Sequence, residues 1–234
     1  METESAPEAS SPDRKAWDLQ RVQALVRLIS GRLRKLVLGD LPAEEAQEVR
    51  LHIAEEGELT ERYVLMAGLS AGIAILGLLQ SSAAVVIGAM LVSPLMGPIA
   101  ALGFGLASFD GERIFRAARA VGIGALMGVA VGVAITLLSP IRNATPEIVA
   151  RTAPTLLDLG VALLSGFAGG YATVHRRGET AIGVAIATAL MPPLATIGYS
   201  IAVWRLDFVF GATLLFLTNL AAIAFAFALV TRVR

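Results

Sequence analysis

The stretch AMLVSPLMGPI, residues 89–99, decides the fold because it places two prolines and a serine in a run that is otherwise apolar enough to lie in lipid. Proline has no backbone N–H and clashes with the carbonyl group one turn earlier, so it interrupts the interior of a helix. The peptide groups that it frees find no water in hydrocarbon, and they are tolerated only where they face protein or a hydrated cavity. The stretch therefore predicts an interrupted helix inside a membrane.

The rest of the composition agrees with a membrane setting. Of the 234 residues, 56% are hydrophobic and 16% are charged, the mean hydropathy is +0.71, and there is no cysteine to form a disulfide or a thiolate metal site. We predict an all-α polytopic membrane protein, because six apolar runs are long enough to cross about 30 Å of hydrocarbon at about 1.5 Å per residue. The predicted spans are residues 63–79, 83–107, 120–138, 155–174, 181–203 and 208–230.

The residues before the first span differ in composition from the rest. Residues 1–16 are polar and predict a disordered tail without a signal peptide, and residues 17–62 predict a helical segment outside the membrane. Within that segment, residues 17–38 alternate apolar and basic side chains at helical spacing. Such a basic amphipathic helix is expected to lie on an anionic lipid surface, or else to pack against its neighbour.

Charge predicts how the spans are oriented. With six spans, most of the 19 Lys and Arg residues fall on the side of both termini, and only Arg142, Arg151 and Arg205 fall on the other. The positive-inside rule then places both termini in the cytoplasm. Residues 139–154 become an external loop, in which Thr145 followed by Pro146 predicts the start of a short helix.

The chain also predicts an internal repeat. Residues 85–95 align with residues 184–194 at a shift of 99, which sets Pro94 opposite Pro193 in the second span of each group of three. Because each group has an odd number of spans, residues 63–138 and 155–234 would form a 3+3 inverted-topology repeat with proline-broken second and fifth helices. Two independent proline kinks are the alternative.

Counting from the span ends places both interruptions and Asn219 near the bilayer centre, where polar groups of the two halves would meet. We therefore predict a midplane site for a small solute or ion. The alternative is that the same polar groups only complete the hydrogen bonds of the kinks. The candidate residues are Ser93, Pro94, Pro98, Thr188, Pro192, Pro193, Thr196, Thr218 and Asn219.

One carboxylate lies within a span, close to its start. Thr155 and Asp158 have the spacing of a capping box, which is a structural role. The functional alternative is an outer mouth for a cation or a proton, formed by Asp158 and Arg151. No other ionisable group lies deep in a span, so a proton relay through the centre is not expected.

Other chemistries have little support in the sequence. His52 and His175 lie outside the predicted spans, and we find no nucleotide-binding or metalloprotease motif. We expect no enzyme activity, cofactor, metal site or nucleic-acid partner. Gly124, Gly128 and Gly132 follow the small-xxx-small pattern of close helix contacts, within the chain or in a homo-oligomer.

Four motifs in order resemble one known family. Residues 84–99, 147–170, 183–194 and 214–223 together are similar to the bacterial and archaeal membrane proteins called domain of unknown function 389. Ser81 departs from the pattern, since we expect Asn there in many members. The resemblance implies a multi-pass protein of a prokaryotic inner membrane, and it implies no substrate or catalytic residue.

The sequence thus predicts a transporter or channel for a small solute or ion. A membrane scaffold or sensor that acts through its cytoplasmic N-terminal helices is the alternative. The two differ at the interruptions, which are hydrated in the first and tightly packed in the second.

Overall fold

The chain divides into two compact units, residues 1–41 and residues 42–234. The computed structural model describes residues 47, 53, 57–175 and 190–232, all of which belong to the second unit. The predicted tail, the basic amphipathic helix and Thr188 lie outside the described residues.

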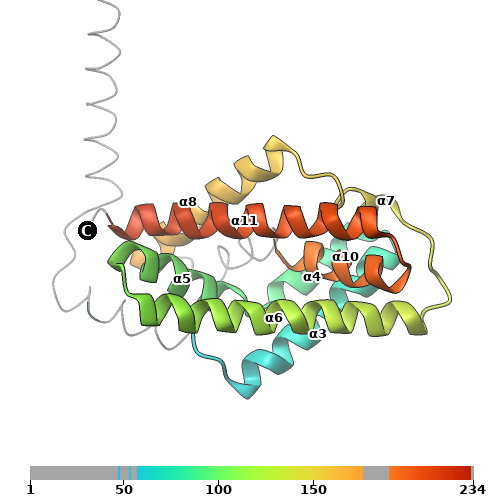
Figure 1. Cartoon of the computed structure of the whole chain (residues 1–234), viewed down its shortest axis with the longest axis horizontal. Coiled ribbons are helices and arrows are strands. Elements are labelled where there is room, and N and C mark those ends of the chain that lie inside the picture. The colour runs from blue at the N-terminus through green and yellow to red at the C-terminus, as the bar shows by residue number, and fades with distance from the viewer. Residues whose placement is uncertain (1–46, 48–52, 54–56, 176–189, 233–234) are drawn as a thin grey trace, which may run out of the picture. The chain divides into compact units, whose positions relative to one another are not determined.

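Every regular element of the described residues is an α-helix (Figure 1). The helices are α3 (Glu61–Leu79), α4 (Ala83–Val92), α5 (Met96–Ser108), α6 (Gly111–Leu138), α7 (Pro146–Val149), α8 (Leu156–His175), α10 (Met191–Ala202) and α11 (Leu206–Arg232). This confirms the prediction of an all-helical chain.

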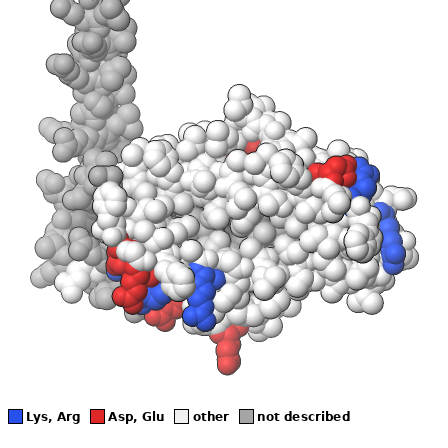
Figure 2. All heavy atoms as spheres, viewed as in Figure 1, with Lys and Arg blue, Asp and Glu red and all other residues white. Residues whose placement is uncertain are grey.

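Four of these helices, α3, α6, α8 and α11, are long and apolar enough to cross a membrane. The pair α4 and α5 makes a fifth candidate span if the two helices count as one, bent by 63° at its break. Figure 2 shows most charged side chains of one face in two groups, with a broad uncharged band between them. The apolar helices therefore indicate a membrane protein.

Two predicted spans differ from the helices of the structure. The third begins at Gly111 and not at residue 120, because Asp110 caps it by accepting a hydrogen bond from the backbone N–H of Arg113 at 3.0 Å. The basic segment that we read as a loop is thus the first part of α6. In the fifth predicted span, α10 begins at Met191 and has 12 residues, while residues 181–189 lie outside the described part.

Short polar side chains set the helix starts on the α3 side of the bundle. Thr60 and Ser82 each accept a hydrogen bond from the backbone N–H three residues later, at 3.1 and 3.4 Å. Ser81, in the tight turn between α3 and α4, has a φ of 52°. Asparagine visits this left-handed region more easily than serine does, which gives a physical reason for the Asn expected at this turn.

Glycines bring the helices into close contact. Gly128 and Gly132 of α6 face α10 near Leu194 and Ala195, and Gly124 faces Tyr63 and Leu95. The glycine stripe is therefore covered within the chain, as the first of our two interpretations predicts. Gly166 and Gly170 bring α8 against α11 in the same way.

The helix starts recur at a constant interval along the chain. The starts of α3 and α8 (61 and 156), of α5 and α10 (96 and 191) and of α6 and α11 (111 and 206) are each separated by 95 residues. Phe109 and Trp204, also 95 residues apart, are the left-handed residues before the two long helices, with φ of 54° and 58°. The interval of the helices is thus 95 residues and not the 99-residue shift that aligned the prolines.

The packing follows the same interval. A Cβ atom added at Gly103 of α5 would lie 3.0 Å from the carbonyl oxygen of Ala224 in α11. A Cβ atom added at Gly198 of α10 would lie 2.5 Å from the carbonyl oxygen of Val129 in α6. Gly198 lies 95 residues after Gly103, and Val129 lies 95 residues before Ala224. Each short helix therefore packs on the long helix of the other half.

We predict that Gly198→Ala lowers the free energy of unfolding by about 1–3 kcal/mol, because the new methyl group meets backbone atoms of α6 that cannot move aside. Gly122→Ala is the control, since a Cβ there has nothing within 4 Å and alanine favours a helix. Denaturation of both purified variants in detergent measures the difference. Equal stability of the two would contradict this account of the contact.

Candidate functional site

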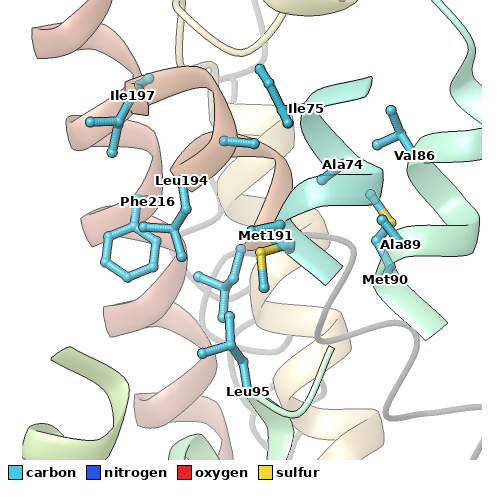
Figure 3. Packing of buried hydrophobic residues seen from close by; sticks show 14 of the residues in the cluster. Ala74, Ile75, Val86, Ala89, Met90, Leu95, Met191, Leu194, Ile197 and Phe216 are labelled. Atoms are coloured by element: carbon cyan, nitrogen blue, oxygen red, sulfur yellow. The ribbon is translucent and has the colours of Figure 1, made fainter. Parts of the chain in front are cut away.

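The interruption between α4 and α5 begins with the half-buried Ser93 and Pro94 and ends in the core of the bundle. Leu95 ends the break and is fully buried, as are Leu190 and Met191 at the start of α10. Leu95 and Met191 belong to one hydrophobic cluster and lie near one another in Figure 3. The break of α4 and α5 and the start of α10 therefore meet inside the protein and do not face away from each other.

Three of the four candidate prolines lie in the first turn of a described helix. Pro98 lies in the first turn of α5, and Pro192 and Pro193 lie in the first turn of α10. The first four N–H groups of a helix have no partner within the helix, so a proline there removes no hydrogen bond. Of the four candidate prolines, only Pro94 lies in a gap between two described helices. Pro98, predicted as part of an interruption, is thus a helix-start residue, and so are Pro192 and Pro193.

A cavity of about 280 Å³ adjoins the start of α10. It brings together Asn219 of α11, Pro193 of α10, Asp158 of α8 and Arg151, which precedes α8. Four predicted site residues, two from the midplane and two from the outer mouth, therefore line a single space. The remaining lining residues are apolar: Ile87, Met90, Val161 and Leu215.

Asn219 is the polar side chain of this cavity that is most deeply buried, with an exposed fraction of 4%. Its neighbour Thr218 does not line the cavity and donates its hydroxyl to the carbonyl oxygen of Leu214, at 2.8 Å, within its own helix. The helical rotation of about 100° between adjacent residues separates the two side chains. Of these two candidates, only Asn219 is placed to contact a molecule in the cavity.

Asp158 has the structural role that its spacing with Thr155 predicts. Its carboxylate accepts the backbone N–H of Thr155 at 2.8 Å and the hydroxyl of Thr155 at 2.6 Å, while Thr155 accepts the N–H of Asp158 at 3.3 Å. These bonds form the capping box of α8. Asp158 is also half-buried and lines the cavity, so the structural and the functional interpretations are compatible.

Arg151 forms its ion pair with Glu147, at 3.4 Å, and not with Asp158. The short helix α7 makes this pair possible, because Thr145 caps it and the two charged residues lie four apart. Sequence reasoning found α7 and Arg151 but missed Glu147 as the partner. The (i, i+4) spacing of Glu147 and Arg151 was the available signal.

Two other predicted residues have hydroxyl groups without a described partner. Ser93 ends α4, and Thr196 is fully buried in α10; the Oγ of the first and the Oγ1 of the second have no hydrogen-bond partner among the described residues. A buried hydroxyl without a partner costs about 1–3 kcal/mol. Neither residue lines the cavity, so the structure does not bring these two candidate hydroxyl groups to it.

The cavity offers a carboxylate, a guanidinium group that is already paired, and a buried amide within apolar walls. Amides and carboxylates bind and orient small polar solutes or ions, and apolar walls strengthen such contacts. Within the described part of the chain, no three side chains of His, Asp or Glu gather as a metal site requires.

Comparisons with known proteins identify the family of the chain. Residues 90–225 match the family described as Domain of unknown function (DUF389). An uncharacterised protein of Methanocaldococcus jannaschii is 30% identical over 188 residues, which are 77% of this chain and 59% of that protein. The chain therefore spans about three fifths of the length of this relative. No solved structure matches the chain.

Two substitutions distinguish the capping of α8 from the role of the Asp158 charge in the cavity. We predict that Thr155→Ala destabilises the protein by about 1 kcal/mol, because it removes the capping hydroxyl of an exposed residue that does not line the cavity. Asp158→Asn keeps an oxygen that can accept the N–H of Thr155 while it removes the charge, so a smaller loss is expected. Thermal unfolding in detergent measures both. A larger loss for Asp158→Asn would show that the charge itself holds α8.

Proposed function

We propose that this chain, which belongs to the DUF389 family, is a membrane transporter or channel for a small solute or ion. The observation that carries the proposal is the cavity in which Asn219, Pro193, Asp158 and Arg151 come together. A scaffold with tightly packed interruptions would not need such a space beside the start of α10. The scaffold or sensor alternative depends on the N-terminal helices, which lie outside the described residues. We further propose that the chain has no enzyme activity.

The 95-residue interval supports the proposal of a 3+3 inverted repeat. In Figure 1, α6 and α11 run in opposite directions across the view, and α5 and α10 lead outward from the middle in opposite directions. Antiparallel halves are the expected arrangement when each half has an odd number of spans. The packing is also symmetric: α5 packs on α11, and the corresponding helix α10 packs on α6, which corresponds to α11. In this arrangement the site would lie between the two halves and extend from Asn219, near the bilayer midplane, to Asp158 and Arg151 on the outer side.

Charge supports an orientation for the proposed transporter. Arg113, Arg116 and Arg119 lie in the first part of α6, whereas Arg142 follows its last residue. The positive-inside rule then places the start of α6 and both termini in the cytoplasm of a prokaryotic cell, with Asp158 and Arg151 at the outer mouth. Anionic lipid at the basic N-terminal helix, and a homo-oligomer, remain proposals for partners.

Introduced cysteines test whether the cavity is hydrated, because the natural chain contains none. We predict that Asn219→Cys reacts in membranes with a small, impermeant methanethiosulfonate reagent, since a thiol reacts as the thiolate and needs water. Thr218→Cys is the matched control on the same helix, outside the cavity, and is expected to react much more slowly. A positively and a negatively charged reagent, compared at position 219, also report the sign of charge that the cavity admits.

Both variants must elute from a sizing column as the parent chain does. No labelling at position 219 in such folded protein, or equal labelling at 218 and 219, would remove the basis of the transport proposal.

Flux into liposomes tests the function itself. In a screen of small inorganic ions and neutral solutes, any flux that the parent chain supports should fall about three- to tenfold in Asn219→Ala, the effect of losing one hydrogen bond. Thr218→Ala should leave that flux unchanged. A permeating species whose flux is insensitive to Asn219→Ala would contradict the proposed pathway.

A further inference from the structure

A second cavity, of about 340 Å³, lies where α6 begins and is separate from the transport site in its lining residues. Three arginines of α6, Arg113, Arg116 and Arg119, line it. They are spaced three residues apart and so lie along one side of the helix. Ala101 of α5 and Ala117 of α6 form part of its apolar wall, and Glu58 is the one acidic residue among the described lining residues.

Arg113 is held in place by contacts that use only part of its guanidinium group. Its Nε donates to Oδ2 of Asp110 at 3.4 Å, and its Cζ lies 4.9 Å from the centre of the Phe104 ring. Its Nη1 is buried and has no hydrogen-bond partner among the described residues. A buried charged donor without a partner is costly, so an acceptor that reached this atom would stabilise it.

The charges around the cavity favour an anion. Arg116 has an ion pair with Glu112 at 3.5 Å, but both side chains are mostly exposed and such pairs contribute little. Asp110 is engaged as the cap of α6 and as the partner of Arg113. Among the described lining residues, the three arginines are thus accompanied by one acidic residue, Glu58, which would repel a bound anion and does not cancel all three charges.

We propose that this cavity binds a phosphate group. Arginine presents several N–H donors in a planar fork that matches phosphate oxygens, and Arg113 already has its fork oriented by Asp110 and Phe104. The apolar wall beside the arginines suits a phosphate attached to an apolar molecule, as in an anionic phospholipid headgroup. Basic pockets between membrane helices bind such headgroups. The site is independent of the transport proposal.

Native mass spectrometry of the full chain with phosphatidylglycerol tests the proposal. We expect Arg119→Gln and Arg113→Gln each to weaken lipid binding about tenfold, the effect of losing a charge-assisted hydrogen bond. Arg119 is exposed and has no ion pair among the described residues, so its replacement is not expected to disturb the fold. Arg142→Gln, an exposed arginine that follows the far end of α6, is the control and should bind as the parent chain does.

The remaining arms decide between sources of the phosphate. If inorganic phosphate at equal concentration displaces the lipid from the parent chain, the site takes free phosphate; if it does not, the ligand is the lipid headgroup. Arg113→Lys should bind with intermediate strength, because lysine keeps the charge and loses the fork. The proposal is overturned if Arg113→Gln and Arg119→Gln bind as the parent chain does, or if Arg142→Gln weakens binding equally.

Discussion

The structure depends on how a helix can stop and start again within an apolar bundle. Backbone groups at such a break must find partners inside the protein, since hydrocarbon supplies none. The chain meets this constraint partly with hydrogen bonds at the break: Ser93 donates its N–H to the carbonyl oxygen of Met90 at 3.3 Å, and Ile99 donates its N–H to that of Leu95 at the same distance. Pro98 lies in the first turn of α5, where a backbone N–H has no acceptor within the helix. The prolines that the sequence analysis assigned to interruptions therefore lie mainly in the first turns of helices, where a proline removes no hydrogen bond.

This distinction explains which part of the repeat could be predicted. The sequence predicts that two proline-containing spans correspond, because their composition is unusual for a membrane helix. It does not show the register, since aligning proline with proline assumes that each proline has the same role. The structure has Leu95-Met96 opposite Leu190-Met191, so that Pro98 corresponds to Pro193. The start of α6 was missed for a similar reason, because hydropathy ignores the cap that Asp110 provides.

The residues of the candidate site could likewise be predicted from composition, whereas their arrangement could not. Asn219 and Asp158 were found individually, as the polar groups of two apolar segments. Counting residues from the end of each span placed Asn219 at the bilayer midplane and Asp158 at the outer mouth. Such counting assumes that all spans start at the same depth and run perpendicular to the membrane. In the structure, α8 crosses close to α11, where Gly166 lies against Ile223, and the third residue of α8 reaches the cavity of Asn219. A contact of this kind depends on the packing of two helices and cannot be read from either one.

The interval of 95 residues also identifies which residues stand at the positions that correspond to Asp158 and Asn219 of the cavity. Asp158 corresponds to Tyr63, and Asn219 corresponds to Gly124. In the first half, the Tyr63 ring fills the space beside Gly124 and its hydroxyl donates to the carbonyl oxygen of Ala120 at 2.9 Å. In the second half, the shorter Asp158 turns back to cap α8, and Leu215, the counterpart of Ala120, lines the open space. One pair of exchanges, tyrosine for aspartate and glycine for asparagine, thus closes one of two equivalent positions with an aromatic ring and leaves the other open and polar.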